Sequence, residues 1–385
     1  MHKAGVGRCE TPGAVMTRLD YRLLAAIVLV LAPSVLNAQQ TPRTDRRLVG
    51  GMTLAYSRSE NRPLANERAY TLQPSVDGIL GVMQSDVGIE SGMGRFAFAL
   101  VVHEGWFSRD NYQGADKAYR NLQQAWLRFD ITPDVSLRAG VMPSHIGYES
   151  MNSRDNFILS RLFCSDATPY YETGASMQWH PLQSLSIEGL VLSGWQRIVA
   201  VNRNLAWGSR INWKPDTTLS ITWGTFYGNM EDRTATRQRA WESQAAWRFY
   251  NNFWVEWKPM PDLTLVGIAD VGRQQLNGDS TATTWCMAAI AALQIHPKCR
   301  LGARAEYFSD PASIMFATPT GPGFVTSSLS CNVDLAINRS TTLRGEIRRM
   351  FSADNIFPSS TGLQNSDVFG TITVNYSVSS SNLPW

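Results

Sequence analysis

The chain has 385 residues, of which 44% are hydrophobic and 17% are charged. Its 35 Lys and Arg residues and 32 Asp and Glu residues leave a net charge of +3 without a long basic block, so nucleic acid is not expected as a partner. The five histidines show no metal-ligand spacing and the five cysteines imply no particular pairing, so we expect no metal and no cofactor, and we leave disulfides open.

The N-terminal region has the layout of a secretory signal peptide. An apolar run over 23–36 follows two arginines and leads to small residues that end at Ala38. We predict a signal peptide over 1–38, with Met16 as a start that would give it a more typical length, and a short periplasmic segment over 39–46. A transmembrane anchor is the less favoured alternative, because the run is shorter than the roughly 20 residues that span a bilayer.

After this region, apolar and polar residues alternate in runs of about ten residues or more. In one run Leu127 and Phe129 share an apolar face while Arg128 and Asp130 share the other. A period of two with one apolar face indicates a β-strand. We predict sixteen strands, near 47–58, 76–88, 95–107, 118–131, 135–144, 172–180, 184–194, 205–214, 217–228, 241–258, 262–274, 282–296, 299–308, 323–337, 341–351 and 366–378.

Tight polar turns, most of them containing Pro, join these strands in pairs. Pro fixes φ and lacks an N–H donor, so it fits a turn better than a strand ladder. Trp179, Trp213 and Trp257 each precede a basic or imidazole side chain and Pro, which suggests that these turns share one depth, as at a membrane interface. The turns lie at 130–134, 179–182, 213–216, 257–262, 295–298 and 337–340.

Long polar loops alternate with the short turns, and both ends of the strand series fall on the turn side. The alternation alone would also allow a soluble sandwich, but the long strands, even count and unequal connections favour a closed membrane barrel. We therefore predict an all-β, transmembrane, antiparallel up-and-down β-barrel of about 16 strands (14–18) over 47–378, with a C-terminal tail over 379–385. The loops lie near 60–75, 108–117, 145–171, 229–240, 309–322 and 352–366.

About sixteen strands leave a water-filled lumen, which predicts passage of small hydrophilic solutes. Charged residues on the polar faces should line it, because Arg or Lys facing lipid near the midplane costs about 2–4 kcal/mol. Arginine outnumbers acid in this set, and a weak anion preference is our hypothesis; mutual ion pairs among ordinary solvated residues are the alternative. The pore-lining candidates are Arg128, Arg138, Glu188, Arg210, Asp270, Arg304, Glu306, Asp334, Arg344, Glu346 and Arg348.

The loop over 142–172 is the most distinctive one, because it is long and rich in aromatic and aliphatic residues. Folding into the barrel mouth would bury those residues and place the loop's charges opposite the basic wall. We interpret it as a candidate constriction, with packing against a neighbouring barrel as an equal alternative. Its candidate residues are Glu149, Arg154, Asp155, Arg161 and Asp166.

Three segments carry a family resemblance: Gly140 to Ser150 (GVMPSHIGYES), Thr168 to Gly174 (TPYYETG) and Leu192 to Ile198 (LSGWQRI). In order and spacing they resemble the OmpL-like β-barrel porin family of Gram-negative outer membranes. The resemblance implies an outer-membrane porin with no catalytic residues to carry over. The chain departs from many such barrels at its end, where strand-like sequence stops near Val378 and several residues precede the terminal Trp385.

The expected function is therefore an outer-membrane porin for passive diffusion, with membrane lipid and small hydrophilic solutes as partners. The alternative is a non-conducting structural or adhesive barrel whose loops bind a partner. An enzyme is not expected, because His103 and His145, near the loops, lie in no recognisable nucleophile motif. The sequence leaves open a homotrimer, for which small residues at 288, 289, 291 and 292 would supply a flat wall.

Overall fold

The computed structural model describes most of the chain, and all structural statements concern this part. The predicted signal peptide, the first residues of the predicted periplasmic segment and most of the predicted tail lie outside it. The described residues are 45–112, 119–200, 204–230, 247–276 and 280–379.

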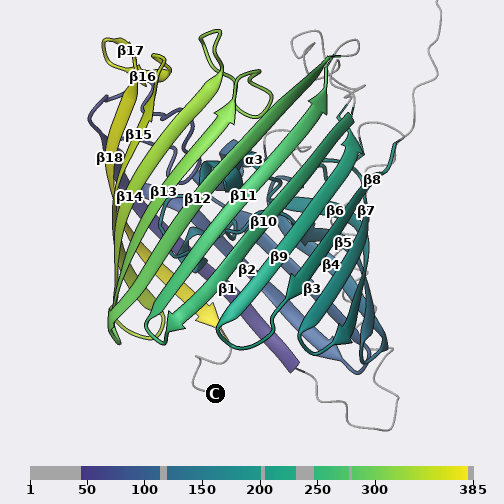
Figure 1. Cartoon of the computed structure of the whole chain (residues 1–385). Helices are drawn as coiled ribbons and strands as arrows, with labels where there is room; N and C mark the ends of the chain where they lie inside the picture. The colour runs from purple at the N-terminus through teal and green to yellow at the C-terminus, as the bar shows by residue number, and fades with distance from the viewer. Residues whose placement is uncertain (1–44, 113–118, 201–203, 231–246, 277–279, 380–385) are drawn as a thin grey trace, which may run out of the picture. The chain divides into compact units, whose positions relative to one another are not determined.

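Sixteen long antiparallel strands close into a single barrel (Figure 1). Each long strand pairs with the next one along the chain, and the last pairs with the first, so no edge is left open. The strands are β1 (Asp45–Ser59), β2 (Gly81–Met93), β3 (Phe96–Glu104), β4 (Leu122–Thr132), β5 (Val135–Pro143), β6 (Tyr171–Leu182), β7 (Leu185–Leu192), β8 (Ala206–Trp213), β9 (Leu219–Asn229), β10 (Trp247–Met260), β11 (Leu263–Gln275), β12 (Thr281–His296), β13 (Cys299–Asp310), β14 (Phe324–Ala336), β15 (Thr341–Ser352) and β18 (Ser366–Ser379).

The loops add only short elements. A two-stranded hairpin, β16 (Phe357–Ser359) and β17 (Gly362–Gln364), lies between β15 and β18. The helical segments are α2 (Trp106–Asn111), η2 (Ser153–Asp155) and α3 (Phe163–Ala167). No helix in the described part of the chain is long and apolar enough to cross a membrane.

The predicted strand count is confirmed, and the largest error in position is at the second strand. It begins at Gly81 rather than at residue 76. The reason is Asp77. Its carboxylate accepts a hydrogen bond from the backbone N–H of Ser59 at 2.5 Å and forms an ion pair with Arg68 at 3.5 Å. These contacts hold residues 76–80 in the first long loop. The third strand also ends early, at Glu104, because α2 follows it.

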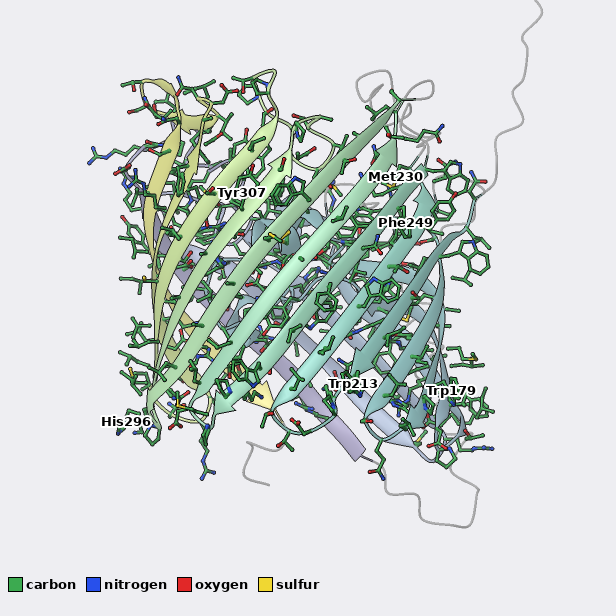
Figure 2. The ribbon with its side chains drawn as sticks, in the orientation of Figure 1. Trp179, Trp213, Met230, Phe249, His296 and Tyr307 are labelled. Carbon is green, nitrogen blue, oxygen red and sulfur yellow. A yellow bond between two sulfur atoms is a disulfide. The ribbon has the colours of Figure 1, made fainter. Side chains whose placement is uncertain are left out.

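The outer surface of the barrel is apolar and carries aromatic residues near both rims. Leu127, for example, is 67% exposed on this surface. Trp179 and Trp213 lie near the rim that carries the short turns, whereas Phe249 and Tyr307 lie nearer the rim with the long loops (Figure 2). An apolar band between two aromatic girdles is the pattern of a transmembrane barrel. We call the two ends the turn rim and the loop rim.

The proposed flat wall of alanines is only half correct. Ala289 and Ala291 lie on the outer face, but Ala288 and Ala292 are buried on the inner face of β12. Successive side chains of a strand point to opposite sides, so adjacent alanines cannot all share one surface.

The apolar core lies inside the barrel and is centred on the loop between β5 and β6. Its largest cluster joins Ile158, Leu162 and Phe163 of this loop to wall residues such as Ile268 and Phe308. A second cluster contains Tyr170 of the loop and a third contains Ile146. The loop is therefore the packing centre of the molecule as well as a connection.

Candidate functional site in the lumen

The loop between β5 and β6 folds into the barrel, where α3 is seen through the wall strands (Figure 1). The backbone N–H of Gly147 donates to Asn252 on β10 at 2.8 Å. Arg154 makes a bidentate pair with Asp86 on β2, at 2.5 and 2.7 Å. β10 and β2 stand eight places apart in the closed order of sixteen strands. The loop thus reaches opposite walls of the lumen within a few residues.

Two arginines of β15 bind the backbone of the loop. Arg344 donates to the carbonyl oxygens of Ser153 at 2.6 Å and Asn156 at 2.9 Å, and Arg348 donates to that of Arg161 at 3.0 Å. The irregular loop backbone needs partners for its buried polar groups, and the forked guanidinium supplies several donors at once. The wall arginines therefore satisfy the loop and fix its path.

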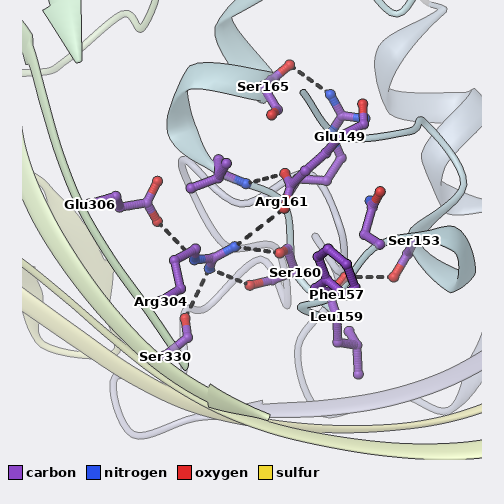
Figure 3. A network of polar contacts seen from close by, with 12 residues as sticks. Glu149, Ser153, Phe157, Leu159, Ser160, Arg161, Ser165, Arg304, Glu306 and Ser330 are labelled. Atoms are coloured by element: carbon purple, nitrogen blue, oxygen red, sulfur yellow. Dashed lines mark hydrogen bonds and ion pairs between the residues drawn. The ribbon is translucent and has the colours of Figure 1, made fainter. Parts of the chain in front are cut away.

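Carboxylates of the same wall satisfy the loop's N–H groups. Glu346 accepts from the backbone N–H of Ser160 at 2.6 Å and from its hydroxyl at 2.7 Å. Glu306 accepts from the backbone N–H of Phe163 at 2.7 Å. Arg304 lies 3.4 Å from Glu306 and 3.5 Å from Glu346, and it donates to the Ser160 carbonyl at 2.5 Å. Figure 3 shows Arg304 between Glu306 and Ser160. Donors and acceptors thus alternate along the loop and wall.

This network is completely shielded from solvent. The side chains of Arg304, Glu306, Glu346 and Arg348 are 0% exposed. Buried ion pairs add little net stability, but removing one partner leaves an uncompensated charge and typically costs about 3–5 kcal/mol. The network therefore discriminates strongly against alternative positions of the loop.

Further contacts hold the loop's own turns together. Arg161 pairs with Asp166 at 3.0 Å and donates to the carbonyl of Ser150 at 2.5 Å. Glu149 accepts from the backbone N–H of Leu162 at 2.7 Å. Burial raises the pKa of Glu149 to about 7, although nearby arginines oppose the shift. These residues stabilise the loop conformation internally.

The first part of the loop is fixed by His145. Its Nδ1 lies 2.7 Å from a carboxylate oxygen of Glu172, and its Nε2 lies 2.7 Å from the carbonyl oxygen of Thr225. A carbonyl oxygen only accepts, so Nε2 carries a proton, and Nδ1 shares a proton with the Glu172 carboxylate. Burial alone would lower the pKa of His145, but Glu172 and the Thr225 carbonyl outweigh it and raise the pKa above its ordinary value.

A disulfide between Cys164 and Cys286 joins α3 to β12. Cysteine spacing did not imply this bond, because 122 residues separate the two positions. Asp270 lies close enough to form a group of metal-ligand type with the two sulfurs. The disulfide removes both thiolates, however, so this group offers no thiolate pair while the bond is intact.

Solvent reaches a different set of inward-facing arginines. Arg128 is 44% exposed and pairs with Asp130 at 3.1 Å, and Arg138 is 28% exposed and pairs with Glu188 at 2.9 Å. Arg210 on β8 is also partly exposed. These side chains come from β4, β5 and β8, whereas the loop covers the inner face of β12 to β15.

The sequence-predicted residues therefore separate by environment. All the wall candidates face inward as their parity predicts, but most lie beneath the loop and not against open water. Those with solvent access are Arg128, Arg138 and Arg210; those buried are Glu188, Asp270, Arg304, Glu306, Asp334, Arg344, Glu346 and Arg348. Of the loop candidates, Glu149, Arg161 and Asp166 are buried, Arg154 is bound to Asp86, and Asp155 stays exposed.

Several contributing residues were missed. Arg300 pairs with Asp334 at 2.5 Å and has the same parity as Arg304, so the strand period could have found it. Asp86 lies where alternation is poor, so parity gave no signal. Trp126 and Trp254 face inward on β4 and β10, where they lie against the inward-facing Arg138 and Arg210.

The fold is shared with solved outer-membrane porins. The chain is similar to the anion-selective porin from Comamonas acidovorans, with a TM-score of 0.58 and 11% identity over 87% of this chain and 100% of that chain. OmpF of Salmonella typhi gives a TM-score of 0.59 and 10% identity over 88% and 98%. OmpT of Vibrio cholerae, in a trimer form, gives a TM-score of 0.57 and 10% identity over 87% of this chain and 99% of that chain. Identities this low show the fold alone.

The family follows from the sequence. No curated protein matches the chain. A family model described as "Putative beta-barrel porin-2, OmpL-like" matches residues 47–378, which is nearly the whole described barrel. The chain therefore belongs to the OmpL-like beta-barrel porin-2 family and is a porin integral to the bacterial outer membrane.

Proposed function

We propose that this porin passes small hydrophilic solutes by diffusion and that the loop over 142–172 is its constriction. The observation that carries the proposal is the pair of contacts from Gly147 to Asn252 and from Arg154 to Asp86, on opposite walls. A loop fixed at both sides narrows the lumen permanently, because moving it would break buried polar contacts. Solute size is then limited beside the loop and not by the barrel.

A second candidate is supported by the depth of this packing. Ile158, Leu159 and Phe163 are fully buried within the barrel, as in the core of a globular protein. A barrel filled in this way would suit a non-conducting structural or adhesive protein whose loops bind a partner. Planar-bilayer recording separates the two functions: stepwise ohmic currents support the channel, and absence of current in folded protein supports the second candidate.

The weak anion preference follows from how the accessible charges are paired. Arg128 and Arg138 each have a carboxylate partner, so their net field is small. Arg210 adds an accessible positive charge. The similar Comamonas acidovorans porin is named as anion-selective, which agrees with this direction.

A salt gradient across a bilayer that contains the porin tests this preference. We predict a reversal potential with the sign of anion selectivity, small in size because most lumen arginines are paired. A reversal potential of the opposite sign would show that the accessible arginines do not control permeation.

We also propose that the porin forms homotrimers through the outer face of β11 to β13. Gly267, Ala289, Ala291 and Ala303 line an outer hollow of about 680 Å³, where large side chains of another copy could pack. The similar OmpT structure is described as a trimer form. Native mass spectrometry of the detergent-solubilised protein should detect a trimer.

Ala289→Trp fills this hollow and should shift the population to monomers. Leu127→Trp, on the outer face of β4 and eight strands around the barrel from β12, is the matched control and should leave the trimer intact. A wild-type protein that is monomeric at all concentrations would refute the assembly.

We propose, finally, that the barrel performs no chemistry. The Nε2 atoms of His103 and His145 both lie within hydrogen-bond distance of backbone carbonyls, those of Arg120 and Thr225. A nucleophile needs a base whose free nitrogen reaches its hydroxyl or thiol. Both nitrogens of His145 are occupied, and the buried Nδ1 of His103 has no hydrogen bond to a hydroxyl or thiol among the described residues.

A further inference from the structure

Arg210 differs from the other accessible arginines in having no carboxylate partner. Its neighbour across the β7–β8 pairing is Glu188, but Glu188 turns to Arg138 and accepts its hydrogen bond at 2.9 Å. Within the described part of the chain, no carboxylate oxygen lies within 4.0 Å of the Arg210 guanidinium, and the guanidinium makes no hydrogen bond. Five N–H donors therefore face the lumen without a protein acceptor.

The guanidinium is nevertheless held in place. Its Cζ lies 5.3 Å from the ring centroid of Trp254 on β10. Trp254 in turn packs edge-on against Tyr148 of the loop, with centroids 6.1 Å apart and planes at 68°. The Tyr148 hydroxyl donates to Glu256 at 3.2 Å. A stack of Arg210, Trp254 and Tyr148 thus connects β8 and β10 to the loop.

This stack leaves the binding edge of the guanidinium free. A cation–π contact is made with the face of the aromatic ring and uses no hydrogen-bond acceptor, so the N–H donors of Arg210 stay available for an oxyanion. The ring restricts the Arg210 side chain before any ligand arrives, so less side-chain freedom is lost on binding. Pairing with Glu188 would occupy this edge, and the Arg138–Glu188 pair prevents that.

The other accessible arginines are not available for this role, because each is already paired with a carboxylate. Arg128 is bound to Asp130 at 3.1 Å, and Arg300 is bound to Asp334 at 2.5 Å. An anion that approached either arginine would compete with the carboxylate that already binds it, on the same strand for Arg128 and on the adjacent strand for Arg300. Arg210 is therefore the described accessible lumen arginine that is both oriented and unoccupied.

We propose that Arg210, held on Trp254, is a binding contact for the oxyanion group of a solute in the lumen, either a carboxylate or a phosphate. Both groups match the guanidinium fork and make charge-assisted hydrogen bonds to it. The proposal rests on the proposed channel function and deepens it, since it gives the porin a preferred solute class and a residue that selects it.

Block of chloride current in planar bilayers tests the site, with benzoate and inorganic phosphate added in separate series. Arg210→Gln should raise the half-blocking concentration of the anion that binds by about tenfold, as expected for loss of one charge-assisted contact. Arg210→Lys keeps the charge but loses the fork, and should lose most of the block while retaining the wild-type reversal potential. Block by benzoate alone assigns carboxylates, and block by phosphate alone assigns phosphates.

Arg128→Gln is the matched control, because it removes the same formal charge from a paired lumen arginine. Its half-blocking concentration should stay close to that of the wild type. Equal loss of block in Arg128→Gln and Arg210→Gln would overturn the proposal, because it would assign the block to the general lumen field. Unchanged block in Arg210→Gln would also overturn it, because it would show that Arg210 does not bind the blocking anion.

A binding measurement keeps the site separate from the channel. Isothermal titration of benzoate or phosphate into the folded porin should give weaker binding for Arg210→Gln than for the wild type, whether or not current flows. A protein that binds but conducts no current would refute the channel and retain the site. A conducting protein with equal binding in both variants would refute the site alone.

Discussion

Gly208 and His145 show how single residues decide where the lumen loop lies. A Cβ atom built on Gly208 of β8 would lie 2.6 Å from the His145 ring. The ring cannot move away freely, since Glu172 and the Thr225 carbonyl hold its two nitrogens. Glycine is therefore needed here for close approach of the loop to the wall.

We predict that Gly208→Ala displaces His145 and weakens the docking of the loop. Overpacking of this kind costs about 1–3 kcal/mol. Urea unfolding of the bilayer-inserted protein should show the lost stability, and single-channel records should show more current noise as the loop moves more.

Gly189→Ala on the adjacent strand is the control, because its added methyl group would meet nothing within 4 Å. Its stability and noise should match those of the wild type. If the two alanine variants behave alike, the contact between Gly208 and His145 does not position the loop.

At the same scale, the sequence predicted where side chains point but not what they contact. A period of two is enough to place Arg304, Arg344 and Arg348 on the inner face. Their partners are carbonyls and hydroxyls of Ser153, Asn156 and Ser160, more than a hundred residues away in the chain. Contacts of that kind depend on the tertiary path of the loop, which local alternation does not encode.

At the scale of elements, strands were predictable and the loop was only partly so. Pro-containing turns and alternating faces gave all sixteen strands, since a barrel repeats the same local rule around its circumference. The apolar content of 142–172 correctly indicated that the loop requires burial. Its attachment through Cys164–Cys286 was not foreseen, because pairing of distant cysteines is decided by their positions in the fold.

The loop also explains why most of the predicted pore-lining charges are buried and do not face water. Wall charges expected to line a water-filled lumen instead meet in a dry network, as with Arg304 and Glu346 at 3.5 Å. Solvent access is retained on β4, β5 and β8, where Arg128, Arg138 and Arg210 lie. We therefore expect the arginines of β4, β5 and β8 to determine selectivity. The buried residues of the loop-covered wall instead hold the loop in place.

In the whole molecule, an apolar outer surface, a closed strand ladder and an internal loop combine into one arrangement. A barrel of sixteen strands is too wide for the wall side chains alone to fill. The loop crosses this lumen from β10 to β2. We therefore expect this loop, and not the barrel, to limit passage.

The most direct test compares single-channel conductance in two proteins that both lack the disulfide. One is the full-length Cys164→Ser/Cys286→Ser variant, and the other carries Cys286→Ser together with deletion of residues 152–166, which removes Cys164. We predict a clearly higher conductance after deletion, since water replaces the buried loop and hydrates the wall charges. Equal conductance in the two proteins would show that the loop does not limit passage.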